Sequence, residues 1–132
     1  MMAEAKQMFF SLSLPTKIHF GRGMARSIGG IISGLGQNAL LISGNDSSRI
    51  NEMLSCLDRH NIRHTLFSQK GEPTIEDVER GCVLAGDLGV DLVIAVGGGS
   101  VMDAGKAIAA LAVNPGAAMT YLEVIGEGRP LT

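Results

Sequence analysis

Four consecutive residues, Gly97, Gly98, Gly99 and Ser100, have the types and spacing needed to bind an anion. They directly follow the apolar run 92–96 and open a segment that we predict to be helical. Glycines allow positive φ and let a ligand approach the main chain, while the unpaired N–H groups at a helix start favour negative charge. A phosphate there would gain charge-assisted hydrogen bonds and about 0.3–1 kcal/mol from the helix dipole. The motif predicts phosphate binding without a basic side chain, which suits a chain of formal net charge −2.

A second interpretation of the same segment is purely structural. Ser100 and Asp103 match the Ser-x-x-Asp pattern of a capping box, so both side chains could serve only the helix start. The two roles are compatible, and three successive glycines exceed what a turn into a helix needs. Lys106 follows Asp103 by three residues, which predicts a surface ion pair of about 0.2–0.5 kcal/mol.

The elements that must position this motif follow from hydrophobic periodicity. We expect strands over residues 39–42, 65–67 and 92–96, followed by helices over residues 47–57, 75–88 and 100–113 respectively. Short connections between them favour right-handed crossovers and parallel strands. The predicted fold class is α/β: a Rossmann-like open, mostly parallel sheet with helices on both faces. Residues 1–132 are expected to form one dinucleotide-binding domain, apparently truncated near its end.

Three finer expectations accompany this fold. Alternating residues over 15–20 predict a further, half-buried strand, and the unbroken apolar run 92–96 predicts a strand buried on both faces. Thr74 and Asp77 form a capping box before the helix over 75–88. We expect the buried face of that helix to consist of Val78, Val83, Leu84 and Leu88.

Ligands of open α/β sheets bind beyond the carboxyl ends of the strands. The segments after Ile42, Phe67 and Val96 are therefore expected to converge on one site. The last of them is the glycine motif, so we place the anion-binding site at this edge of the sheet.

Composition excludes several classes of function. With 45% hydrophobic and 18% charged residues, the chain is expected to be globular and lacks the basic surface that nucleic-acid binding requires. The longest apolar stretch, residues 107–113, is far shorter than the roughly 20 residues that cross a membrane. Cys56 and Cys82 show no metal or disulfide spacing, and no cleavage site follows the apolar residues before Pro15, so we expect a cytoplasmic protein.

The segment Gly97-Gly-Gly-Ser-Val-Met-Asp-Ala-Gly-Lys-Ala107, reached through Asp91-Leu-Val-Ile-Ala-Val96, resembles the cofactor-binding segment of the iron-dependent (group III) alcohol dehydrogenase family. Ile18-His-Phe-Gly-Arg-Gly23, Glu72-Pro-Thr74 and Tyr121-Leu-Glu123 occur in the order of the same family. The resemblance implies an N-terminal domain that binds NAD or NADP. It also implies that the whole enzyme interconverts a small alcohol and its aldehyde or ketone.

The resemblance assigns roles to particular residues. It implies that the pyrophosphate lies on Gly97, Gly98, Gly99 and Ser100, with Asp103 near the nicotinamide side. In the family, one aspartate and three histidines of a C-terminal helical domain hold iron or zinc, and we expect neither that domain nor its ligands within these 132 residues. The histidines of this chain, His19, His60 and His64, are expected to be solvated or locally hydrogen-bonded.

Cofactor choice stays open at this point. Many family members carry an aspartate that binds the adenosine ribose and repels a 2′-phosphate, and the matching position here is Gly44, so NADP is not excluded. Asn45 follows, and the polar residues after Gly44 are expected either to bind ribose hydroxyls or to cap the next helix. Glu72 stands where the family often has Asn, which weakens the case for a nicotinamide contact there.

Two other interpretations remain beside that of a domain of an active dehydrogenase that is inactive alone. In the first, the chain is a nucleotide-binding module or a truncated product with no catalysis of its own. A relative such as glycerol dehydrogenase or dehydroquinate synthase shares the glycine loop and sheet, but Ser100 and the Asp103-x-x-Lys106 continuation favour the alcohol dehydrogenases. By analogy with the family, a homo-oligomer is the expected protein partner.

Overall fold

A three-stranded parallel sheet forms the centre of the molecule, in a computed structural model that describes residues 15–44 and 47–132. The strands are β1 (Asn38–Ser43), β2 (Arg63–Ser68) and β3 (Leu92–Val96), in the order β2-β1-β3. Leu41 of β1 pairs with Leu66 on one side and with Ile94 on the other. The three predicted central strands are confirmed, with β1 and β2 slightly longer than expected.

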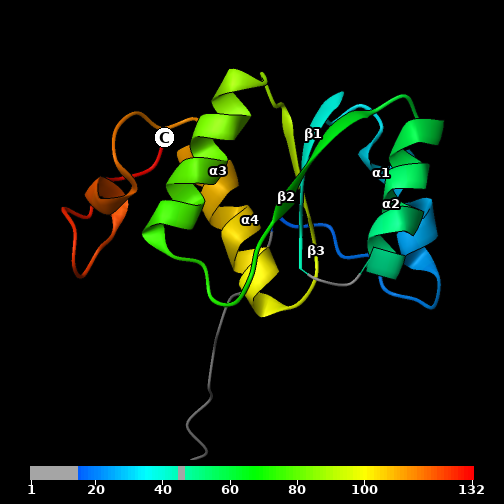
Figure 1. Cartoon of the computed structure of the whole chain (residues 1–132), viewed down its shortest axis with the longest axis horizontal. Coiled ribbons are helices and arrows are strands. Elements are labelled where there is room, and N and C mark those ends of the chain that lie inside the picture. Colours follow the sequence, from blue (N-terminus) through cyan, green and yellow to red (C-terminus); the bar gives the residue numbers. More distant parts are fainter. Residues whose placement is uncertain (1–14, 45–46) are drawn as a thin grey trace, which may run out of the picture.

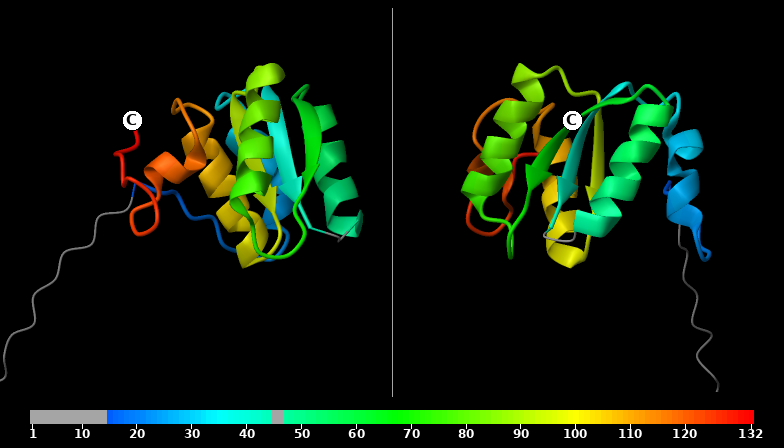
Figure 2. Two further views of the ribbon diagram at one scale, coloured as in Figure 1. Left: turned by 60° about the vertical axis from the view of Figure 1, so that its left-hand side comes forward. Right: turned by 45° about the vertical axis from the view of Figure 1, so that its right-hand side comes forward.

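Helices cover both faces of this sheet (Figures 1 and 2). One face carries α1 (Ile28–Ile32) and α2 (Ser47–Arg59), and the other carries α3 (Ile75–Asp87) and α4 (Gly99–Leu111). Two short 3-10 helices, η1 (Met24–Ser27) and η2 (Ala118–Tyr121), flank these layers. The predicted α/β class is therefore confirmed. Within the described ranges, no helix combines the length and apolar character that a membrane span requires.

The central strand β1 builds both halves of the core. Its side chains alternate between faces, as the two-residue period of a strand requires. Ala39 and Leu41 pack in the cluster that α1 and α2 cover, whereas Leu40 and Ile42 pack in the cluster under α3 and α4. All four are fully buried, which is worth roughly 1.5–3 kcal/mol for each Leu or Ile side chain.

The strand β3 is less enclosed than its sequence predicts. Ile94 is buried, but the four other residues of β3 are only half-buried. The expectation of a strand buried on both faces is therefore wrong for most of β3. The reason is its place in the sheet, because β3 pairs with β1 on one side and forms the outer edge on the other.

The helix α3 begins as predicted, and the prediction of its buried face is confirmed only in part: Val78 is buried and Leu84 packs half-buried against the core. The Thr74 hydroxyl accepts from the main-chain N–H of Asp77 at 3.1 Å, and the Asp77 carboxylate accepts from the N–H of Thr74 at 3.2 Å. The buried residues of the helix are Val78, Gly81 and Ala85.

Val83 and Leu88, which were predicted to be buried, are instead 63% and 43% exposed. The difference comes from the contact between α3 and α4. A Cβ atom at Gly81 would overlap the Ile108 side chain of α4, so the two helices meet along the line that contains this glycine. Small residues at the contact let the helices approach closely, and the larger residues to the side remain outside.

Residues 15–20 do not form the predicted half-buried strand. They have no regular secondary structure, and Ile18 and Phe20 are 76% and 100% exposed. An alternating pattern produces a strand only when the segment pairs with a neighbouring strand. In the described part of the chain, residues 15–20 pair with none of the three strands.

The amino edge of the sheet is closed by its own polar side chains. Nδ2 of Asn38 donates to the carbonyls of Leu88 and Gly89 at 2.7 and 3.0 Å. The main-chain N–H groups of Gln37 and Asn38 donate to Oδ1 of Asp91 at 2.9 and 2.8 Å. These hydrogen bonds, with Asn38 the main contributor, hold the pKa of Asp91 below its ordinary value.

Candidate functional site

The loops that follow the three strands meet at the carboxyl edge of the sheet, as predicted. They line a hollow of about 290 Å3, which we call the carboxyl-edge hollow. Gly44 comes from the segment after β1, residues 69–71 follow β2, and residues 98–101 follow β3. The loops after β2 and β3 lie together at the lower end of the sheet in Figure 1.

The three glycines of the motif differ in their structural role. None of Gly97, Gly98 and Gly99 uses the positive φ that glycine allows. At Gly97, a Cβ atom would lie 2.8 Å from Cγ2 of Val101, which makes this glycine a packing requirement. At Gly98 and Gly99, a Cβ atom would meet no heavy atom within 4 Å. The fold leaves open space beside these two residues, which a ligand can occupy.

The first turn of α4 faces this hollow with its main-chain donors. The helix begins at Gly99, and its N-cap residue Gly98 has no side chain with which to cap it. The first N–H groups of a helix lack partners within the helix and form the positive end of its dipole. Their position at the hollow suits an anion, as the sequence motif predicts.

The Ser100 side chain does not cap the helix α4, although its spacing from Asp103 permits that role. Its hydroxyl donates to Oε1 of Glu72 at 2.8 Å, a bond that joins the glycine loop to the loop after β2. The interpretation of Ser100 and Asp103 as a capping box is therefore wrong. Asp103 lies further along α4 with an exposed side chain, and its Oδ1 is 3.6 Å from Nζ of Lys106. The predicted surface ion pair is confirmed.

The structure brings together most of the predicted site residues. Four of them line the hollow: Gly44, Gly98, Gly99 and Ser100. Gly97 packs against Val101 beside it, and Asp103 is set back along α4, outside its lining. Asn45 lies outside the described residues.

Sequence reasoning did not find Gln69, Lys70 and Gly71, which also line the hollow. Lys70 is exposed and contributes a positive charge. Gln69 is only 3% exposed, and its Oε1 is a buried atom that no described group contacts as a donor. The sequence signal for these residues is their position directly after β2, because ligands of open α/β sheets bind beyond the carboxyl ends of the strands. The open space at two glycines, the cation and the unpaired oxygen together fit a ligand that carries both anionic and hydroxyl groups.

The histidines do not form a metal site. Nδ1 of His60 lies 2.9 Å from the carbonyl oxygen of Cys56, and Nδ1 of His64 lies 3.3 Å from that of Ile62. His19 is exposed. Local hydrogen bonding, expected from the sequence, is confirmed for His60 and His64. Across residues 15–44 and 47–132, no three His, Cys, Asp or Glu side chains are placed to hold a metal ion, so these residues do not fit iron or zinc.

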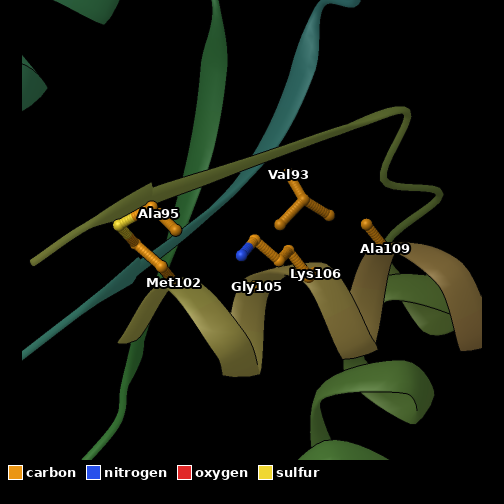
Figure 3. A pocket seen from close by; sticks show the side chains of 6 residues that line it. All are labelled: Val93, Ala95, Met102, Gly105, Lys106 and Ala109. Atoms are coloured by element: carbon orange, nitrogen blue, oxygen red, sulfur yellow. The ribbon is translucent and has the colours of Figure 1, made fainter. Parts of the chain in front are cut away.

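A second hollow, of about 280 Å3, lies between the outer edge of β3 and α4 (Figure 3). Val93 and Ala95 of the strand face Met102, Gly105 and Ala109 of the helix, with Lys106 contributing the charged group. This lining is mostly apolar and offers no helix terminus. It is less suited to a phosphate than the carboxyl-edge hollow.

Comparison with known proteins decides the family. The model of the iron-containing alcohol dehydrogenases matches residues 15–132, which is nearly the whole chain. The chain belongs to the iron-containing alcohol dehydrogenase family. The resemblance carried by the glycine segment is thus confirmed, and the chain corresponds to the N-terminal domain of these dehydrogenases.

Several members of the family are similar in sequence or structure. NADH-dependent butanol dehydrogenase A of Clostridium acetobutylicum is 36% identical over 106 residues, which are 76% of this chain and 27% of that enzyme. The solved NADH-dependent butanol dehydrogenase A of Thermotoga maritima has a TM-score of 0.79 at 32% identity, over 85% of this chain and 30% of the other. The chain therefore spans less than a third of the length of either relative.

The same fold occurs at lower identity. Sulfoacetaldehyde reductase of Bifidobacterium kashiwanohense, solved in complex with NAD+, aligns with a TM-score of 0.80 at 21% identity. The alignment covers 95% of this chain and 33% of the reductase. At this identity the likeness shows the fold alone.

Proposed function

We propose that the chain is the NAD(P)-binding domain of a metal-dependent alcohol dehydrogenase and that the carboxyl-edge hollow holds the pyrophosphate of the cofactor. One observation carries this proposal. The first turn of α4 opens onto space that the fold does not need, because Gly98 and Gly99 accept a Cβ atom without overlap. Donors beside unused space at a strand end are the arrangement expected of a dinucleotide site.

In the proposed complex, main-chain N–H groups of Gly98, Gly99 and Ser100 donate to pyrophosphate oxygens. Lys70 adds a positive charge from the opposite loop, and Gly44 leaves room for a ribose at the end of β1. The hollow of about 290 Å3 lies at the small end of ligand pockets, roughly 300–1,000 Å3, so the rest of the cofactor extends beyond it. We assign Gly97 to the packing of this loop, Asn45 to the ribose side and Asp103 to the nicotinamide side.

The bound nicotinamide supplies the hydride chemistry, and the chain binds and orients it. The proposed overall reaction interconverts a small alcohol and its aldehyde or ketone, supported by the butanol dehydrogenases among the relatives. Iron or zinc would polarise the substrate oxygen from residues other than the described ones, which form no metal site. We therefore propose that the 132-residue chain binds cofactor but does not turn over alone.

The names of two relatives specify NADH, which supports NAD as the cofactor. Gly44 places no carboxylate beside the proposed ribose position, so the 2′-phosphate of NADP would not be repelled there. The proposed location is the cytoplasm, and the free thiols of Cys56 and Cys82 support it.

Titration of the purified chain with NADH and NADPH, followed by cofactor fluorescence and calorimetry, tests the binding proposal. We expect saturable binding of at least one cofactor. Absence of binding to a folded sample would overturn it. Assays with added iron or zinc and short alcohols then separate the alternatives, because turnover by this chain alone would contradict its assignment as a binding domain.

A further inference from the structure

Gln69 is buried in the wall of the carboxyl-edge hollow. Its main-chain N–H donates to the carbonyl of Ser43 at 2.8 Å, which continues the pairing of β1 with β2 by one residue. The residue is 3% exposed, and no group in the described part of the chain donates to Oε1. Because a buried acceptor without a donor is unfavourable, this oxygen marks a place where a donor is needed.

The neighbours of Gln69 determine which end of its amide remains unpaired. Nε2 lies 3.3 Å from the carbonyl oxygen of Gly71 and 3.5 Å from Oδ2 of Asp77. Asp77 is ionised at neutral pH, since its hydrogen bond from the main chain of Thr74 keeps its pKa below the ordinary value. Both neighbours are therefore acceptors, and a rotated amide would set oxygen against oxygen. The amide nitrogen stays toward Asp77, and the oxygen is left without a donor.

The hollow therefore presents two opposite requirements. The N–H groups of residues 98–100 and the charge of Lys70 suit an anion, whereas Oε1 of Gln69, buried in the wall of the hollow, needs a hydrogen-bond donor. A bare phosphate or pyrophosphate satisfies the donors and leaves Gln69 unpaired. A phosphorylated sugar satisfies both, because its hydroxyl groups lie a few bonds from the phosphate.

We propose that Oε1 of Gln69 accepts a hydrogen bond from a ribose hydroxyl next to the pyrophosphate, and that this bond makes the hollow selective for a nucleoside diphosphate over free pyrophosphate. The inference rests on the proposed function and adds the residue that selects the sugar. Oε1 is out of contact with solvent in this structure, so the hydroxyl reaches it when the loop of residues 70–72 moves outward. That movement breaks the 2.8 Å bond between Ser100 and Glu72 and the 3.3 Å contact of Nε2 with the Gly71 carbonyl, so Asp77 alone then holds the amide nitrogen in place.

Two substitutions at Gln69 test this selection. Gln69→Met keeps the length of the side chain and removes the acceptor, whereas Gln69→Glu keeps an acceptor oxygen at the same position. Dissociation constants for ADP-ribose and for inorganic pyrophosphate are measured by calorimetry in the wild-type chain and both variants. The informative quantity is the ratio of the two constants, because general damage to the hollow weakens both ligands together.

We expect Gln69→Met to reduce the preference for ADP-ribose by about tenfold, the effect of one hydrogen bond, while pyrophosphate binds as in the wild type. Gln69→Glu weakens both ligands through its charge but retains the preference. An unchanged ratio in Gln69→Met overturns the inference and leaves the proposed function intact. If Gln69→Met does not fold, a preference lost in Gln69→Glu overturns it instead. If neither ligand binds the wild-type chain, the proposed function fails, and the inference fails with it.

Discussion

Substituting Gly99 by alanine separates the needs of the fold from those of the ligand. A Cβ atom at position 99 meets no heavy atom within 4 Å and lies at the first residue of α4. Alanine is favoured over glycine inside a helix by up to about 1 kcal/mol, so we expect Gly99→Ala to be as stable as the wild type or slightly more stable. The same methyl group occupies space assigned to the pyrophosphate.

The expected loss of affinity follows from the hydrogen bonds that the methyl group displaces. A hydrogen bond to a charged group contributes about 1.5–3 kcal/mol, so losing one raises the dissociation constant for NADH by about 10- to 150-fold. Thermal unfolding and cofactor fluorescence measure the two effects on the same sample. Wild-type affinity for NADH in a folded Gly99→Ala chain would refute the assignment of this space to the pyrophosphate.

Gly97→Ala is the matched control, because the same methyl group has a different neighbour there. Its Cβ atom would lie 2.8 Å from Cγ2 and 2.9 Å from Cβ of Val101. Overpacking of this kind costs about 1–3 kcal/mol, so we expect a lower melting temperature in the absence of ligand. A destabilised Gly99→Ala beside an unaffected Gly97→Ala would show that the packing of the glycine loop is misassigned.

Three further predictions concern other substitutions in the same chain. Glu72→Gln removes a negative charge bonded to Ser100, so we expect severalfold tighter binding of pyrophosphate at low salt and a smaller gain at high salt, measured by calorimetry. Gly44→Asp has room for its Cβ atom, 3.7 Å from Cγ2 of Val101, and its carboxylate should reduce affinity for NADPH at least tenfold more than for NADH in parallel titrations. The pKa of Asp91 is lower in the folded chain than in the unfolded chain, where it is near 3.8. Ionised Asp91 therefore stabilises the fold above pH 3.8, and this stabilisation is lost as the pH falls through the folded-state pKa. Melting curves from pH 7 to pH 2 should therefore show a smaller acid-induced loss of stability in Asp91→Asn.

The parts of the fold that sequence predicts well are those fixed by local pattern. The run around Leu40 and Leu41 is apolar on both faces, and it forms the fully buried central strand. Thr74 and Asp77 form their capping box because both partners lie within one helical turn. Because ligands of parallel sheets bind beyond the carboxyl ends of the strands, the sequence alone predicts that the glycine loop and Gly44 lie at one site, and both line the same hollow.

The remaining features depend on residues far apart in the chain. Ser100 and Glu72 are 28 positions apart, so the partner of the hydroxyl is set by how two loops meet. Likewise, the buried face of α3 is set by Ile108 of a different helix packing against Gly81. Gln69 is different, because the acceptors Gly71 and Asp77 that hold its amide nitrogen are near in sequence, but the burial of its oxygen without a donor depends on how the loop after β2 packs.

The two ends of the sheet differ in how completely the chain satisfies its own polar groups. At the amino edge, the Asn38 and Asp91 side chains bond to main-chain groups, so these polar groups are already paired within the chain. At the carboxyl edge, the first turn of α4 opens onto the hollow, and Oε1 of Gln69 is buried without a donor in the wall of the same hollow. A buried oxygen without a donor lowers stability, whereas the N–H groups at the exposed start of α4 can bond to water. Under the proposed function, a ligand hydroxyl that donates to Oε1 of Gln69 would recover the stability that this one unpaired oxygen costs the fold.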